Sequence, residues 1–104
     1  MKIALAQHNY TVGDVAGNTA RIFASIEEAG RAGCDAVVFS EMAVTGYPPM
    51  DLLDQPAFVD DALAAVVEIV RASRAFPALT VIFGAIDRAA RAGDDAEREQ
   101  ALRR

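Results

Sequence analysis

Short apolar runs alternate with longer stretches of helical periodicity along the chain. The first run, KIALAQ at residues 2–7, predicts a strand with Ile3 and Leu5 on one face. The second, CDAVVF at residues 34–39, is apolar on both faces, which is typical of a strand inside a covered parallel sheet. The third, LTVIFGAI at residues 79–86, is rich in β-branched and aromatic residues. The pattern therefore predicts three strands.

Two helices are expected between these strands. Asn18 is placed to cap the first helix, with Gly30 and Gly33 ending it, and Pro56 suits the first turn of the second. The apolar faces that we expect to pack are Ile22, Phe23, Ile26 and Ala29 in the first helix, and Val59, Leu63, Val66, Val67 and Val70 in the second. Alternating strands and helices predict an α/β fold with right-handed crossovers and a parallel or mixed sheet.

The remaining residues, 87–104, have a different composition. Alanine and one leucine are their apolar residues, and Asp94–Arg98 and Glu99–Arg103 are spaced as weak helical ion pairs. We therefore divide the chain after residue 86 and expect a solvated helix or a frayed tail in its last part.

Bulk properties narrow the classes of function. A chain of 104 residues with 53% hydrophobic content has room for one small packed domain. Its net charge of −5 argues against a binder of nucleic-acid phosphates. A single Cys allows no internal disulfide, and we find no signal peptide or apolar run of membrane-spanning length. We therefore expect a cytoplasmic protein that binds neither nucleic acid nor membranes.

One stretch carries a chemical signal. In FSEMAVTGYPP, residues 39–49, the second apolar run gives way to Ser40 and Glu41, and a turn containing Gly46 follows. Glycine adopts backbone angles that other residues avoid, and the two prolines stiffen the turn. The sequence thus places a carboxylate at a strand end, beside a rigid turn.

The stretches KIALAQHNYTVGDVAGNTARI, GCDAVVFSEMAVTGYPPMDLL and PAFVDDA resemble the nitrilase (carbon-nitrogen hydrolase) superfamily. They are most similar to the start of the glutaminase domain of glutamine-dependent NAD⁺ synthetases. The resemblance covers about residues 1–84 and fades after Gly84. It implies a four-layer αββα sandwich, of which this chain would form a partial βαβαβ unit with a polar tail.

The resemblance also implies site residues. Glu41 matches the general base of the family's Glu-Lys-Cys set, and Tyr47 matches a tyrosine lining the amide-substrate pocket. A partly desolvated carboxylate at a strand end suits the removal of a thiol proton. Lys2 and Cys34 match neither of the family's other two catalytic positions, and Ser40 stands where the family usually has Pro. We expect Glu41 to be mostly buried, and the chain alone to be inactive.

In the intact parent, the resemblance implies hydrolysis of glutamine, with the ammonia used to make NAD⁺ from deamido-NAD⁺ and ATP. The synthetase part, which would use ATP and Mg²⁺, is absent, so no cofactor is expected in this chain. Two alternatives stay open. One is a generic nitrilase-type amidase fragment. The other is a non-enzymatic α/β module acting by self-association or partner binding, since a partial sandwich would leave apolar faces uncovered.

Other candidate residues have structural interpretations. Cys34 is expected to be a buried, inert packing residue, and His8 a hydrogen-bonded structural residue. Asp51 and Asp54 are more typical of caps than of a metal pair. The glycines near the first strand do not form GxGxxG, so a phosphate-binding loop is not expected.

Overall fold

A computed structural model describes residues 1–47 and 49–86. Within them the elements run in the order β1 (Ile3–Ala6), α1 (Val15–Arg31), β2 (Ala36–Phe39), η1 (Met50–Asp54), α2 (Pro56–Ser73) and β3 (Thr80–Ile82). The predicted alternation of strands and helices is confirmed. The tail at 87–104, with its expected ion pairs, lies outside the described residues.

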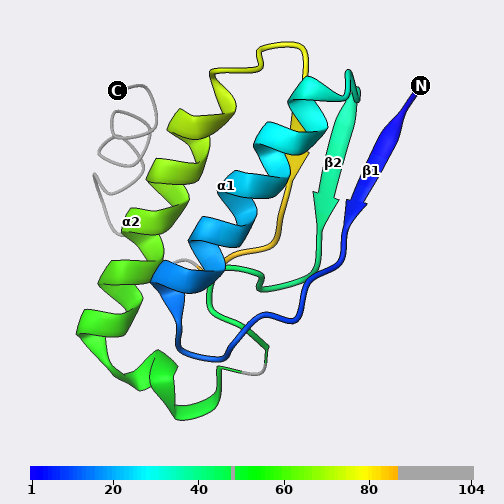
Figure 1. Cartoon of the computed structure of the whole chain (residues 1–104). Coiled ribbons are helices and arrows are strands. Elements are labelled where there is room, and N and C mark those ends of the chain that lie inside the picture. Colours follow the sequence, from blue (N-terminus) through cyan, green and yellow to red (C-terminus); the bar gives the residue numbers. More distant parts are fainter. Residues whose placement is uncertain (48, 87–104) are drawn as a thin grey trace.

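The three strands form one parallel sheet in the order β1-β2-β3. Leu5 pairs with Val38, and Val38 pairs with Ile82, so these side chains share one face of the sheet. Both helices cover the opposite face, and each crossover is right-handed (Figure 1). The sheet is therefore an α/β unit with its helices on one side.

Helix α1 begins and ends differently from the expectation. Asp14, not Asn18, caps it, because the Asp14 Oδ1 accepts a hydrogen bond from Gly17 N at 3.0 Å. At the other end, Gly33 has a φ of +74° beyond the C-cap Ala32, as expected for a helix-ending glycine. Gly30, however, lies inside the helix, where its missing side chain leaves room for the ring of Phe76.

Helix α2 begins with Pro56 as predicted, but it turns a different face to the core. The residues that we expected to pack, Val59, Leu63, Val66, Val67 and Val70, are only half-buried. The buried residues are Phe58, Ala62, Ala65 and Ile69. The two alanines on this face let α2 lie close to α1, which accounts for the rotation away from the valine-rich face.

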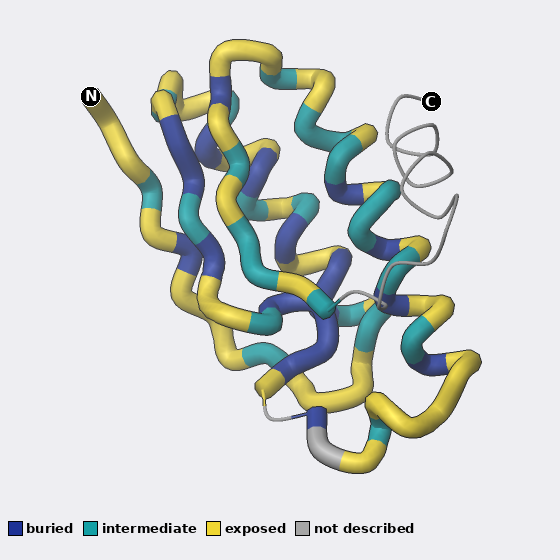
Figure 2. The backbone as a smooth tube through the Cα atoms, turned by 180° about the vertical axis from the view of Figure 1, so that it is seen from behind, coloured by how far each residue is buried: buried dark blue, intermediate teal, exposed yellow. Residues whose placement is uncertain are grey.

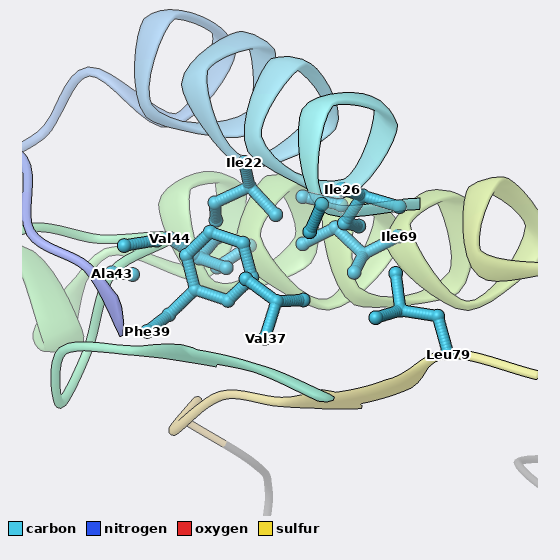
Figure 3. Close-up of a cluster of buried hydrophobic side chains, with 12 residues drawn as sticks. Ile22, Ile26, Val37, Phe39, Ala43, Val44, Ile69 and Leu79 are labelled. Carbon is cyan, nitrogen blue, oxygen red and sulfur yellow. The ribbon is translucent and has the colours of Figure 1, made fainter. Parts of the chain in front are cut away.

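The core lies between the two helices and the covered face of the sheet (Figure 3). Ile22 and Ile26 of α1 meet Val37 and Phe39 of β2, and Ile69 of α2 closes the cluster. Ala43 and Val44 also belong to it, although they lie in the loop after β2. The end of β2 is thus anchored in the core beyond the strand itself.

The other face of the sheet is apolar and open. Ile3 is 53% exposed, Leu5 69% and Ile82 51%. Seen from behind, the strands lie in front of the helices, and none of the described elements covers them (Figure 2). We call Ile3, Leu5, Val38 and Ile82 the open face.

Candidate functional site at the carboxyl edge of the sheet

Glu41 lies just past the carboxyl end of β2, which ends at Phe39. It opens a turn that continues to Thr45. The segment from this turn to η1 runs along the carboxyl edge of the sheet (Figure 1). Glu41 thus follows the second strand, at the edge where parallel α/β sheets have their ligand sites, while its catalytic role stays a prediction.

Hydrogen bonds fasten this turn to the loop after β1. Asn18 is fully buried, and its Nδ2 donates to the carbonyl oxygens of Val44 at 3.0 Å and Thr11 at 2.8 Å. Its Oδ1 accepts from Thr11 N at 2.9 Å. Gly13 N donates to Thr45 O at 2.9 Å. We call these four contacts the clasp.

The backbone of the turn is unusual at both ends. Met42 has a left-handed φ of +54°, and Gly46 has a φ of +76°. A Cβ at Gly46 would lie 2.6 Å from Val12 Cα, so only glycine fits between the turn and the first loop. Gly84, beyond β3, also approaches closely, since a Cβ there would lie 3.3 Å from Met42 N.

Contrary to expectation, Glu41 is exposed. The turn sends Ala43 and Val44 into the core and leaves the Glu41 side chain in solvent. In the part of the chain that the structure describes, its carboxylate forms no hydrogen bond or ion pair. The turn fixes the Glu41 backbone but supplies none of the expected burial.

Tyr47 follows the turn and is 67% exposed. None of the contacts among the described residues joins it to Glu41. Its preceding residue, Gly46, is fixed by the left-handed backbone, while Pro48 lies outside the described residues. The role of Tyr47 in a substrate pocket therefore stays a prediction.

Lys2 and Cys34 lie at the opposite edge of the sheet from Glu41. The Nζ of Lys2 donates to Ala32 O at 2.8 Å, and its backbone N donates to Asp35 Oδ2 at 2.7 Å, both just before β2 begins. Cys34 lies two residues before the start of β2 and is half-buried rather than buried as expected. Because the whole of β2 separates them from Glu41, neither residue can reach it.

The other candidates are structural in the described residues. The Nε2 of His8 lies 2.6 Å from Ser25 Oγ, and its ring meets that of Tyr10 edge-on. Asp51 and Asp54 lie within η1 and do not cap it, because its N-cap is Pro49, without a side-chain hydrogen bond.

The hydroxyl of Tyr10 lies in an environment that changes its pKa. Burial raises the pKa of its hydroxyl above the usual value of 10.0, and the nearby Arg21 guanidinium partly opposes the effect. The Tyr10 hydroxyl oxygen is buried and has no hydrogen-bond partner among the described residues. It packs on the core beside the loop that the clasp holds.

Two further observations bear on cofactors and membranes. Residues 1–47 and 49–86 contain no group of three or more His, Cys, Asp or Glu side chains that could hold a metal ion. None of the helices in that same part of the chain is long and apolar enough to cross a membrane.

Sequence reasoning missed two residues of this site. Asn18 was assigned to a helix cap, although its position one turn inside α1 is where a buried amide reaches back to the preceding loop. The left-handed backbone of Met42 has no sequence signal, since methionine is not a residue that favours it.

Comparisons with known proteins agree with this architecture. The model of the carbon-nitrogen hydrolase family matches residues 2–100, beyond Gly84, where we expected the resemblance to fade. The glutamine-dependent NAD(+) synthetase of Xylella fastidiosa (strain Temecula1) is 42% identical over 80 residues, covering 76% of this chain and 15% of the relative. The synthetase of Aquifex aeolicus is 35% identical over 82 residues, covering 79% and 14%.

A third synthetase, from Thermotoga maritima, is 32% identical over 87 residues, covering 84% of this chain and 15% of the relative. The chain thus spans about 15% of the length of these curated relatives. The division after residue 86 stays a prediction. Since the family model covers nearly all of the sequence, the chain belongs to the carbon-nitrogen hydrolase family.

Proposed function

We propose that this chain supplies the general-base segment of a glutaminase-type amidase site. The observation that supports this most strongly is the position of Glu41, at the carboxyl end of β2 in a turn anchored in the core. In the intact parent the site would hydrolyse glutamine to glutamate and ammonia. The ammonia would serve NAD⁺ synthesis from deamido-NAD⁺, with ATP and Mg²⁺ bound at another domain. The setting would be cytoplasmic.

The chemistry assigned to Glu41 is proton transfer. A thiol that attacks an amide carbon must first lose its proton, and a carboxylate fixed at a strand end can accept it. Burial of this carboxylate would come from parts of the intact site other than residues 1–47 and 49–86. Cys34 and Lys2 lie at the wrong edge of the sheet to take part. The chain alone should therefore release no ammonia from glutamine.

A chimera tests the proposal. The 80 residues of the Xylella fastidiosa synthetase that match this chain are replaced by their counterparts here. We expect glutamine-dependent ammonia release, and a loss of at least about 100-fold in kcat with Glu41→Gln, since general-base catalysis contributes roughly 10²–10⁴-fold. Glu28→Gln, an exposed change on α1, is the matched control and should have no effect. Full activity of the Glu41→Gln chimera would refute the role of Glu41.

The same chimera tests Tyr47 as a residue that lines the amide pocket. Tyr47→Ala should raise KM for glutamine more than it lowers kcat, because a wall residue acts mainly on binding. A change in kcat with KM unaltered would contradict a binding role. Activity on simple amides but not on glutamine would instead favour a generic nitrilase-type amidase.

A second candidate function is favoured by the open face. Leu5 and Ile82 are more than half exposed and lie on either side of Val38 on one sheet face. We propose that this face is covered by a second copy of the chain, which would make the protein a self-associating module whether or not it takes part in catalysis.

A further inference from the structure

Met42 holds a conformation that L-residues avoid. Among the described residues it is the only non-glycine residue with a positive φ. The left-handed region brings Cβ too close to the following carbonyl oxygen, and such residues persist only where the surroundings leave no alternative. Three contacts confine it. Its carbonyl oxygen accepts from Gly46 N at 2.9 Å and from Thr45 Oγ1 at 3.4 Å, and Gly84 lies against its amide.

The far end of the same turn is held by Asn18. Both hydrogens of its side-chain amide and its Oδ1 are engaged, so the group cannot rotate without leaving buried polar atoms unpaired. One of its acceptors is Val44 O, two residues beyond Met42. The turn is therefore fixed to β2 at Phe39 and to α1 at Val44.

We propose that Asn18 is a positioning residue for the Glu41 carboxylate and acts by holding Met42 in its left-handed conformation. The residues between Phe39 and Val44 have to reverse the direction of the chain within two fixed ends. A right-handed Met42 would carry Val44 away from the Asn18 amide. Because both ends of the turn are held, a change in the Met42 angle has to be taken up by the residues before it, Glu41 among them. The importance of the Glu41 orientation for catalysis rests on the proposed function. The dependence of the Met42 backbone angle on the Asn18 hydrogen bonds, which we call the coupling, does not.

The coupling is tested first by stability. Met42→Gly and Met42→Ala both remove the side chain, so their difference reports the penalty of the backbone angle less the greater freedom of glycine in the unfolded chain. We expect the Met42→Gly variant to melt about 5 °C or more above the Met42→Ala variant, because glycine carries no left-handed penalty. Ala24→Gly, at an exposed position of α1, is the control and should lower the melting temperature.

The second measurement asks whether Asn18 is responsible. Asn18→Asp keeps the acceptor for Thr11 N but removes both donors. In this background we expect the one-bond Cα–Hα coupling of Met42, which reports the sign of φ, to move to the right-handed value. The advantage of glycine over alanine at position 42 should vanish. The carboxyl-carbon NMR resonance of Glu41 should shift, and that of Glu28 on α1 should not.

A purely structural Asn18 gives a different result. The Asn18→Asp variant would then melt lower while Met42 kept its positive φ and the glycine advantage stayed unchanged, which would overturn the proposal. If that variant does not fold, hydrogen exchange of the unmodified chain decides. The Asn18 side-chain amide and the Gly46 amide should open together with one temperature dependence, and independent openings would refute the coupling. These measurements do not use glutamine, so their failure is distinct from a failure of the proposed function.

Discussion

Gly46 and Gly33 have nearly the same backbone angle but different surroundings. Their φ values are +76° and +74°, yet a Cβ at Gly46 would strike Val12, while one at Gly33 would meet nothing within 4 Å. We expect Gly33→Ala to cost about 1–2 kcal/mol of unfolding free energy, from the left-handed angle alone. Gly46→Ala should cost about 2–5 kcal/mol, because overpacking adds to the same term. Urea denaturation measures both, and equal costs would contradict the close approach of the two loops.

Tyr10 predicts a dependence of stability on alkaline pH. Its folded pKa lies above the unfolded value of about 10, so the folded state keeps the proton to higher pH than the unfolded chain does. The free energy of unfolding should thus be insensitive to this group below pH about 10 and fall as the pH rises through the folded pKa. Tyr10→Phe should remove that part of the fall, as seen by urea denaturation across pH.

The control for this experiment is Tyr47→Phe, which alters an exposed tyrosine and should keep the wild-type fall. At neutral pH, Tyr10→Phe should raise the free energy of unfolding by about 1–3 kcal/mol, because it removes a buried hydroxyl that has no partner among the described residues. A large loss at neutral pH would mean that the hydroxyl is bonded.

The residues of the candidate site differ in how far the sequence predicts them. Glu41 was predictable in position, since an apolar run that ends in a carboxylate marks the end of a strand. Its exposure was not, because burial depends on groups far away in the sequence. Asn18 and Met42 were not predictable either: a buried amide and a left-handed methionine arise from the way two loops meet, which no local pattern records.

At the scale of elements, the two long helices begin in contrasting ways. Asp14 caps α1 with its carboxylate, whereas Gln55, the N-cap of α2, makes no side-chain hydrogen bond. Asp14→Ala should therefore cost about 0.5–2 kcal/mol, while Asp14→Asn should be close to neutral. Gln55→Asp should add about 0.5–1 kcal/mol, since it supplies both a cap and a charge at the helix N-terminus.

The predicted stabilities of Asp14→Ala, Asp14→Asn and Gln55→Asp can be measured by thermal and urea unfolding. The Gln55 backbone is already extended, as a cap requires, so the gain needs no rearrangement. A loss of stability in Gln55→Asp would mean that this end of α2 is closed by contacts outside residues 1–47 and 49–86.

The elements themselves were predicted well, but their orientation was not. Periodicity indicated α2 and its start at Pro56, because proline at a first turn is a strong local signal. The same periodicity favoured the valine-rich face, whereas the buried face contains Ala62 and Ala65. Hydrophobicity favours burial of large apolar side chains, whereas close packing of two helices favours small residues. The sequence alone does not show which of the two effects decides the buried face of α2.

At the scale of the whole molecule, the open face predicts self-association. Burying a leucine-sized side chain is worth about 1.5–3 kcal/mol, or roughly 10- to 100-fold in a dissociation constant. Leu5→Glu should weaken the self-association constant by at least this factor, as measured by light scattering or sedimentation. Leu53→Glu, an exposed apolar residue of η1 away from the sheet, is the matched control. A wild-type chain that stays monomeric at millimolar concentration would exclude the second-copy proposal.

The order β1-β2-β3 follows the order of the sequence, which has a consequence for synthesis on the ribosome. Among these three strands, β2 and β3 each find their neighbour already made when they leave the exit tunnel, and neither has to insert between two others. At about 5–20 residues per second, successive strands emerge within about ten seconds of each other. The growing chain can therefore add one strand and its covering helix at a time, and Glu41 would be set in its turn only when β3 arrives and Gly84 closes against Met42.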